Sequence, residues 1–258
     1  MSIQSNANQN LESENDADAV VKIKNLYKAF GNNSVLIDFN LNLRPGENLV
    51  VLGKSGSGKS VLIKCIIGLM KPEKGSINVL GNEVPDLNST DLDILRAKVG
   101  FLFQSNALYD SMTVRENLEF PLRRHWIKTN KNDVSDLVIE ALTNVGLANT
   151  IDMLPAELSG GMRKRIALAR TLILKPQIIL YDEPTTGLDP ITGKEISNLM
   201  NDVKKKYKTS SIIISHDINC VKIVADRIIM LIEGKCYATG TLEELKNSVD
   251  LKVKQFFE

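Results

Sequence analysis

The chain has 258 residues, enough for one large domain or two small ones with a substantial buried core. Its 32 Lys and Arg residues nearly balance its 31 Asp and Glu residues, and this formal net charge of +1 argues against a nucleic-acid partner. Three widely spaced cysteines fit neither a disulfide framework nor a zinc cluster, which favours a reducing compartment. No apolar run approaches the roughly 18 residues of a membrane span, and no charged-then-apolar leader opens the chain, so we expect any membrane role to come through a partner.

The chain divides into a polar start and a longer patterned part. Residues 1–19 contain four acidic residues and almost nothing apolar, which predicts a disordered tail before a folded domain over residues 20–258. In that domain, short β-rich runs alternate with stretches of helical periodicity. Strands are expected over residues 20–23, 35–43, 48–52, 76–80, 99–103, 178–181, 211–214 and 227–232. Helices are expected over residues 59–70, 114–122, 133–145, 161–174, 192–207 and 218–224.

This alternation of strands and helices predicts an α/β fold with a largely parallel sheet. Residues 105–164 lack clear strands, so we expect a helical subdomain there. No internal repeat is visible in the sequence.

A phosphate-binding loop is the strongest local signal. Residues 53–60 read Gly-Lys-Ser-Gly-Ser-Gly-Lys-Ser and stand between a predicted strand and a predicted helix, the context that this motif requires. Glycines let backbone N–H groups approach phosphate oxygens, and the start of the helix adds its positive dipole end. The flanking elements disfavour the alternative of a Gly/Ser loop that binds nothing. The expected nucleotide-binding residues of this segment are Gly53, Ser55, Gly56, Gly58, Lys59, Ser60 and Val61.

The phosphate loop and a second motif, which ends in two carboxylates, together predict how phosphate, Mg²⁺ and water would be bound. Lys59 can reach the β- and γ-phosphates of a nucleotide, and the Ser60 hydroxyl can bind Mg²⁺. Residues 178–183 form an apolar run that ends in Asp182 and Glu183. We expect Asp182 to hold Mg²⁺ through water and Glu183 to act as a general base on the attacking water. A surface turn before Pro184 is the alternative interpretation of the two carboxylates, and the phosphate loop makes it weak.

A third motif narrows the protein class. Residues 158–162, Leu-Ser-Gly-Gly-Met, precede a basic helical stretch and resemble the signature motif of ABC (ATP-binding cassette) ATPases. The resemblance covers residues 20–258, essentially the whole predicted domain. Met162 stands where most members of that family have Gln, but Ser159 and the backbone amides remain, so we expect activity to be retained.

The resemblance implies a fold and further site residues. The fold would be a P-loop NTPase with a mixed sheet, largely parallel in its core and antiparallel in its N-terminal β part, with an inserted helical subdomain. Phe30 stands where the family stacks an aromatic ring on adenine, and Gln104 where it senses Mg²⁺ and contacts the membrane partner. His216 stands at the γ-phosphate histidine, and residues 187–189 at the loop that crosses between subunits. Taken alone, Phe30 could be a core aromatic residue, Gln104 an ordinary strand end and His216 a structural histidine.

The implied assembly contains more than one subunit. The expected catalytic set is Lys59, Gln104, Glu183 and His216, and the expected metal set is Ser60, Gln104 and Asp182. Ser159, Gly160 and Gly161 would serve the ATP of a second ATPase subunit, because one chain supplies one phosphate loop and one signature. We therefore expect a pair, most simply a homodimer, bound to a polytopic membrane permease at the cytoplasmic face of the inner membrane.

Several patches resemble one branch of the ABC family, the Mla-type phospholipid transporter ATPases. The resemblance implies phospholipid cargo and a possible MCE-type lipid-binding partner. ATPases of amino-acid, lipoprotein or drug transporters remain the alternative. ABC ATPases that act on ribosomes or DNA are less favoured, because this chain has neither two cassettes nor long coiled coils. The similar patches are residues 102–109, 119–123, 154–162, 189–192 and 253–257.

Overall fold

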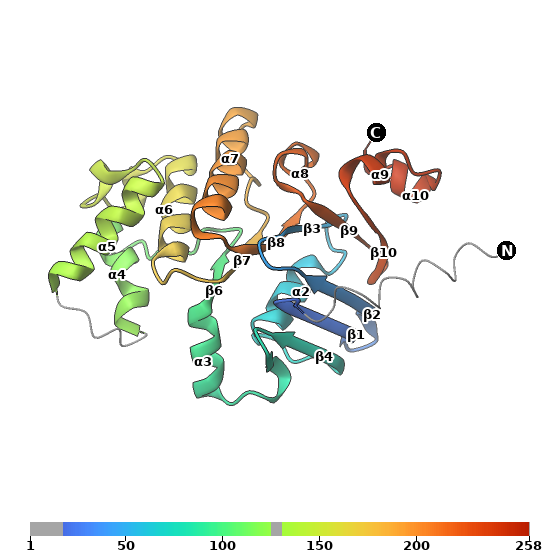
Figure 1. The fold of residues 1–258 in the computed structure, drawn as a ribbon. Helices are drawn as coiled ribbons and strands as arrows, with labels where there is room; N and C mark the ends of the chain where they lie inside the picture. The colour runs from blue at the N-terminus through green and yellow to red at the C-terminus, as the bar shows by residue number, and fades with distance from the viewer. Residues whose placement is uncertain (1–17, 125–130, 258) are drawn as a thin grey trace.

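The computed structural model describes residues 18–124 and 131–257. The predicted tail, residues 1–19, therefore lies almost wholly outside the described residues. The described strands form two sheets, which Figure 1 shows on either side of a helix. An antiparallel sheet has the order β2-β1-β4-β5, made of β2 (Asn33–Leu43), β1 (Val21–Phe30), β4 (Lys74–Val79) and β5 (Asn82–Glu83).

The second sheet carries the functional strands. Its order is β10-β9-β3-β8-β7-β6, and only β10 runs antiparallel to its neighbour. Every residue of β3, β7 and β8 is buried, as expected for inner strands of a parallel sheet that is covered on both faces. The strands are β10 (Lys235–Gly240), β9 (Arg227–Ile232), β3 (Asn48–Leu52), β8 (Ser210–Ser215), β7 (Ile178–Asp182) and β6 (Val99–Leu102).

Helices cover both faces of this sheet. α2 (Lys59–Ile66) lies between the two sheets, where its buried Leu62 and Ile63 share one core cluster with Phe39 of β2 and Ile212 of β8. α6, α7 and α8 pack on the opposite face, as Figure 1 shows. Their bounds are α6 (Gly160–Leu172), α7 (Pro190–Tyr207) and α8 (Ile218–Val224). The remaining α-helices with described bounds are α3 (Ser89–Lys98), α4 (Val114–Arg124), α5 (Lys131–Asn144), α9 (Leu242–Lys246) and α10 (Leu251–Lys254).

A third core cluster lies outside the sheets. Apolar side chains of α4 and α5 pack there against one side of α6. Short 3-10 turns at Val84–Asp86, Ala148–Thr150 and Pro155–Glu157 connect the elements. No described helix combines the length and apolarity that crossing a membrane requires.

The predicted α/β class with a parallel core and an antiparallel N-terminal part is confirmed, with that part forming a sheet of its own. The helix predicted over residues 59–70 is shorter in the structure. It ends at Ile66 because Gly68 has a φ of +66°, outside helical geometry. The predicted helical segment, residues 105–164, contains no strand among its described residues, although residues 105–113 form an irregular loop with turns and not a helix. Its status as a separate subdomain stays a prediction.

Candidate active site

Four parallel strands bring the predicted catalytic residues to one edge of the six-stranded sheet. β3 leads into the phosphate loop, residues 53–60, and β7 ends at Asp182. β8 is followed directly by His216, and β6 is followed two residues later by Gln104. The order β3-β8-β7-β6 makes these strands neighbours, so their carboxyl ends meet. Ligands of open α/β sheets bind at this edge.

The phosphate loop is packed so tightly that two of its positions accept only glycine. Gly58 has a φ of +101°, and a Cβ atom there would lie 2.8 Å from Cγ1 of Val35 on β2. A Cβ atom on Gly53 would lie 2.8 Å from the carbonyl oxygen of Leu231 on β9. The loop therefore exposes its backbone N–H groups without intervening side chains, as phosphate binding requires.

The other predicted loop residues divide between surface and core. Ser55 and Gly56 are exposed, whereas Val61 is half-buried and packs against the core between the sheets. Ser57 Oγ is buried and has no hydrogen-bond partner among the described atoms. An orphaned hydroxyl inside the loop fits a site that is completed by phosphate oxygens.

Ser60 and Asp182 together offer oxygen ligands to a cation. Ser60 Oγ donates a hydrogen bond to Asp182 Oδ1 at 3.0 Å. Burial raises the pKa of Asp182 because it disfavours the charged carboxylate, and the hydrogen bond from Ser60 lowers this pKa in part. A bound cation would stabilise the charged carboxylate. Among the described residues no group of three or more His, Cys, Asp or Glu side chains could hold a metal ion. Mg²⁺, which keeps several waters and prefers phosphate and carboxylate oxygens, still fits this pair.

Glu183 lies at the centre of the site. Its side chain is only 10% exposed, and its Oε1 lies 3.6 Å from Lys59 Nζ. Its Oε2 lies 2.8 Å from His216 Nδ1 and accepts a hydrogen bond from Thr186 Oγ1 at 3.2 Å. Lys59 itself donates to the carbonyl oxygen of Gly53 at 2.9 Å. The structure thus brings together Lys59, Glu183 and His216, which are far apart in sequence.

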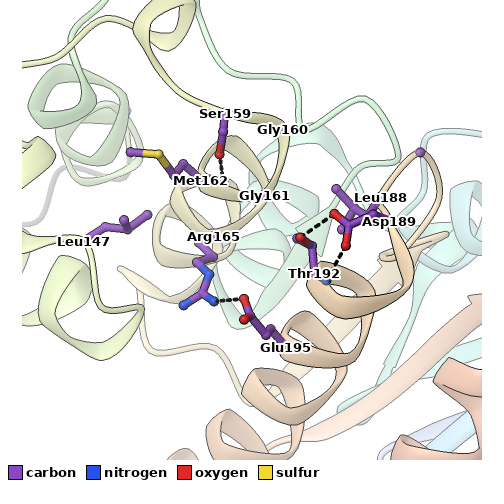
Figure 2. A pocket seen from close by; sticks show the side chains of 11 residues that line it. Leu147, Ser159, Gly160, Gly161, Met162, Arg165, Leu188, Asp189, Thr192 and Glu195 are labelled. Atoms are coloured by element: carbon purple, nitrogen blue, oxygen red, sulfur yellow. Dashed lines mark hydrogen bonds and ion pairs between the residues drawn. The ribbon is translucent and has the colours of Figure 1, made fainter.

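The predicted signature residues lie apart from this centre. Ser159 caps α6 by accepting a hydrogen bond from the backbone N–H of Met162 at 3.2 Å. Figure 2 shows that the first turn of α6 and the start of α7 line one pocket, of about 450 Å³. Arg165 of α6 and Glu195 of α7 close it with an ion pair of 2.6 Å. No described residue of the phosphate loop lines this pocket, so within one chain the signature lines a hollow that the phosphate loop does not share.

Comparison with known proteins decides the family. The ABC transporter family matches residues 36–186, more than half of the chain. A probable ribonucleotide transport ATP-binding protein from Mycobacterium leprae is 40% identical over 236 residues, which cover 92% of this chain and 68% of that protein. The chain belongs to the ABC transporter family. The ABC ATPase predicted from the sequence is thereby confirmed, as is its nucleotide, ATP.

Other relatives of this ABC ATPase differ in the cargo that their names state. The intermembrane phospholipid transport system ATP-binding protein MlaF of Haemophilus influenzae is 36% identical, covering 93% of this chain and 90% of that protein. A methionine import ATP-binding protein of Campylobacter jejuni is also 36% identical, covering 92% and 75%. A dimeric ATP-binding cassette solved with ADP and Pi aligns with a TM-score of 0.78 and 34% identity, covering 86% and 98%. The chain spans about two thirds of the length of its mycobacterial relatives.

Two predicted residues of the ABC ATPase lie at the rim of the site. Gln104 is exposed just beyond β6, and no described hydrogen bond fixes its side chain. Phe30 is 48% exposed at the tip of the hairpin between β1 and β2, whose Val35 packs against Gly58 of the phosphate loop. Both side chains are therefore accessible from solvent.

Sequence reasoning missed the part played by Lys164. It is 2% exposed on α6, and its Nζ donates a hydrogen bond of 3.0 Å to the carbonyl oxygen of Gln104. Burial lowers the pKa of Lys164 to about 8, although the nearby charge of Asp182 opposes the shift. The sequence placed Lys164 only in a basic helix start. Its spacing of three and four residues from the buried Ala167 and Leu168 is the signal that marks it as inward-facing.

Proposed function

We propose that this ABC ATPase hydrolyses ATP between two paired chains and thereby powers phospholipid transport through a membrane permease. The observation that supports the chemistry most is the buried Glu183 carboxylate, held between Lys59 and His216. A carboxylate fixed between a phosphate-binding cation and a histidine is suited to accept a proton from an attacking water. Glu183 would be the general base.

The surrounding residues would bind and orient the nucleotide. Lys59 binds the β- and γ-phosphates, and Ser60 and Asp182 hold Mg²⁺ with Gln104 as the sensor of that ion. Bound Mg²⁺ neutralises charge on the phosphate oxygens. His216 orients the γ-phosphate end of the site, where it already contacts Glu183.

The signature would act on the ATP of the partner chain. Gly160 and Gly161 open α6, so unbonded N–H groups and the positive end of the helix dipole are available there for a γ-phosphate. Support comes from the signature pocket, which no described phosphate-loop residue lines, and from the dimeric state of a related cassette. ATP would favour the closed pair and products the open pair, which converts hydrolysis into motion.

A docking segment, residues 104–113, would pass that motion to the permease. Asn117 of α4 is fully buried and folds this segment: it accepts from the N–H of Tyr109 at 2.9 Å and donates to the carbonyl oxygens of Tyr109 and Met112, both at 3.1 Å. Leu108 packs into two core clusters, so its role is structural. Tyr109 is 42% exposed and rests against Phe120, which leaves an apolar anchor beside the sensor glutamine.

The cargo and location follow from similarity. Overall identity does not separate the phospholipid transporter relative from the methionine importer, since both are 36% identical. Residues 102–109, which include the first part of the docking segment, and residues 154–162, which include the signature Met, support the phospholipid branch. An MCE-type lipid-binding protein would then complete a complex at the cytoplasmic face of the inner membrane.

The test is transport by the intact complex. The complex would be purified from its native membrane through a tag on this chain and reconstituted in vesicles with labelled phospholipid and labelled methionine. We expect ATP-dependent movement of phospholipid that stops in a matched complex carrying Glu183→Gln. ATP-dependent methionine uptake without lipid movement would instead assign the second candidate function, amino-acid import, which the methionine relative favours.

A further inference from the structure

The Lys28 ammonium lies over one face of the Phe30 ring on β1. Lys28 Nζ is 5.2 Å from the ring centroid, within the range of about 6 Å over which a cation is attracted to an aromatic face. The Lys28 side chain is only 13% exposed, whereas Phe30 is 48% exposed. One side of the ring is therefore covered by a positive charge while the ring as a whole stays accessible.

Hydrogen bonds fix this ammonium in place. Lys28 Nζ donates to Glu73 Oε1 at 2.5 Å and to the carbonyl oxygen of Lys71 at 2.9 Å. Glu73 Oε2 also accepts from the backbone N–H of Ala29 at 2.8 Å, so one carboxylate holds both the ammonium and the backbone beside Phe30. The hydrogen bond from Lys28 holds the pKa of Glu73 below its ordinary value, which keeps the carboxylate ionised.

We propose that Lys28 is a positioning residue for the nucleotide base: its ammonium supports the Phe30 ring from one side and presents the other side to adenine. The inference rests on the proposed stacking of adenine on Phe30 and deepens it. Stacking on a ring needs a fixed ring, since ordering a mobile side chain during binding lowers affinity. Because Lys28 acts through the ring, it should set affinity for the base and leave the binding of phosphates unchanged.

The experiment is calorimetric titration of the purified chain with two probes. Adenylyl imidodiphosphate carries base and phosphates, and inorganic tripolyphosphate carries phosphates alone. Lys28→Met keeps an unbranched stem without the charge, and we expect it to weaken binding of the adenine probe by about 3- to 10-fold. Tripolyphosphate affinity should change by less than about twofold, and Lys28→Arg should restore most of the loss. Lys71→Gln is the matched control, because it removes a neighbouring charge but keeps the carbonyl oxygen that Lys28 uses.

A Phe30→Ala variant distinguishes the role of Lys28 from the stacking of adenine on Phe30, on which that role depends. If Phe30→Ala leaves the affinity for the adenine probe unchanged, the stacking of adenine on Phe30 is itself wrong. If Phe30→Ala weakens that affinity while Lys28→Met does not, only the Lys28 inference is overturned. An equal loss for tripolyphosphate in Lys28→Met, or an equal loss in Lys71→Gln, would also overturn it. The melting temperature of each variant reports whether the hairpin still folds.

Discussion

Glu183 holds a backbone conformation that its residue type does not favour. Its φ is +51°, in the left-handed region, where a side chain other than glycine is strained. The surroundings hold it there: its N–H donates to the carbonyl oxygen of Ile214 at 3.0 Å, and Thr186 and His216 contact its carboxylate. Strain of this kind persists where neighbouring structure fixes a residue for function. Here it aims the carboxylate at the phosphate loop.

Replacing this carboxylate tests its proposed role as the base. Glu183→Gln keeps the shape of the side chain and its bond from Thr186 but cannot take up a proton. We expect ATP to bind with near-normal affinity while turnover falls by roughly 10²-fold or more. Steady-state ATPase assays and nucleotide titration measure the two effects. Glu140→Gln, which removes a carboxylate paired with the exposed Lys175, is the control, and near-normal turnover in Glu183→Gln would refute the assignment.

The sequence predicted those site residues whose chemistry lies in short contiguous motifs. Lys59, Ser60 and Asp182 could be named because a loop, a strand end and a helix start surround them. Thr186 and Lys164 could not be assigned roles in the same way. Their partners, a carboxylate on a strained turn and a carbonyl oxygen 60 residues away, exist only once the chain has folded.

At the scale of single elements, α6 connects two parts of the proposed machinery. Its first turn carries the signature, and its buried face carries two cations that bind the docking segment. Lys164 donates to the carbonyl oxygen of Gln104, while Arg170 donates to those of Asn106 at 2.9 Å and Ala107 at 2.8 Å. Asn106 and Ala107 both have positive φ angles, so their turn depends on these bonds. A displacement of α6 would therefore move Gln104 as well.

Removing one of these bonds should slow catalysis without unfolding the chain. Lys164→Met keeps an unbranched stem but leaves the carbonyl oxygen of Gln104 without its charged donor. A hydrogen bond to a charged group contributes about 1.5–3 kcal/mol, so we expect turnover to fall about tenfold with ATP affinity unchanged. The melting temperature should fall but the fold should persist, because the lost bond costs stability while the apolar side chain still fills the buried position. Lys175→Met changes an exposed residue just after α6 and should have the turnover of the wild type. If Lys164→Met also has the turnover of the wild type, the hydrogen bond between Lys164 and Gln104 does not contribute to catalysis.

The elements that the sequence missed are those with weak patterns. α3 buries only Leu95 and is otherwise polar, so its periodicity is faint. β10 is an edge strand without a fully buried residue, and α9 and α10 are only five and four residues long. By contrast, β3 and β9 matched their predicted bounds, since buried apolar runs mark inner strands directly.

For the whole molecule, the docking segment predicts how the chain meets its permease. Tyr109→Asp places a charge on the exposed anchor while Asn117 still holds the backbone, so the isolated fold should survive. Loss of such an anchor costs on the order of 2 kcal/mol of binding free energy, which weakens association with the membrane subunit about 30-fold. Co-purification from solubilised membranes measures the loss. Ile139→Asp, an equally exposed apolar site on α5, is the control, and normal permease association in Tyr109→Asp would remove this surface from the proposal.

Pairing of two chains can be tested by mixing two inactive ones. Lys59→Ala removes the phosphate-binding cation, and Gly160→Asp puts a negative charge into the signature where the γ-phosphate of the partner's ATP would lie. Gly160 is the better position for this substitution, because a Cβ atom there would lie 3.9 Å from the nearest atom, in Leu188. A Cβ atom at Gly161 would lie only 2.7 Å from Thr192 and would clash. Each variant alone spoils both sites of its homodimer.

A mixed dimer of these variants combines one intact phosphate loop with one intact signature, and it therefore contains one complete site. We expect partial ATPase activity to return on mixing and to rise with protein concentration as the pair assembles. Steady-state assays across mixing ratios, with sedimentation to measure pairing, report this recovery. Full-rate hydrolysis by a monomer, or mixtures as inactive as their parents despite proven mixed dimers, would show that each chain completes its own site. Since the signature pocket contains no described residue of its own phosphate loop, recovery on mixing is the outcome that the geometry favours.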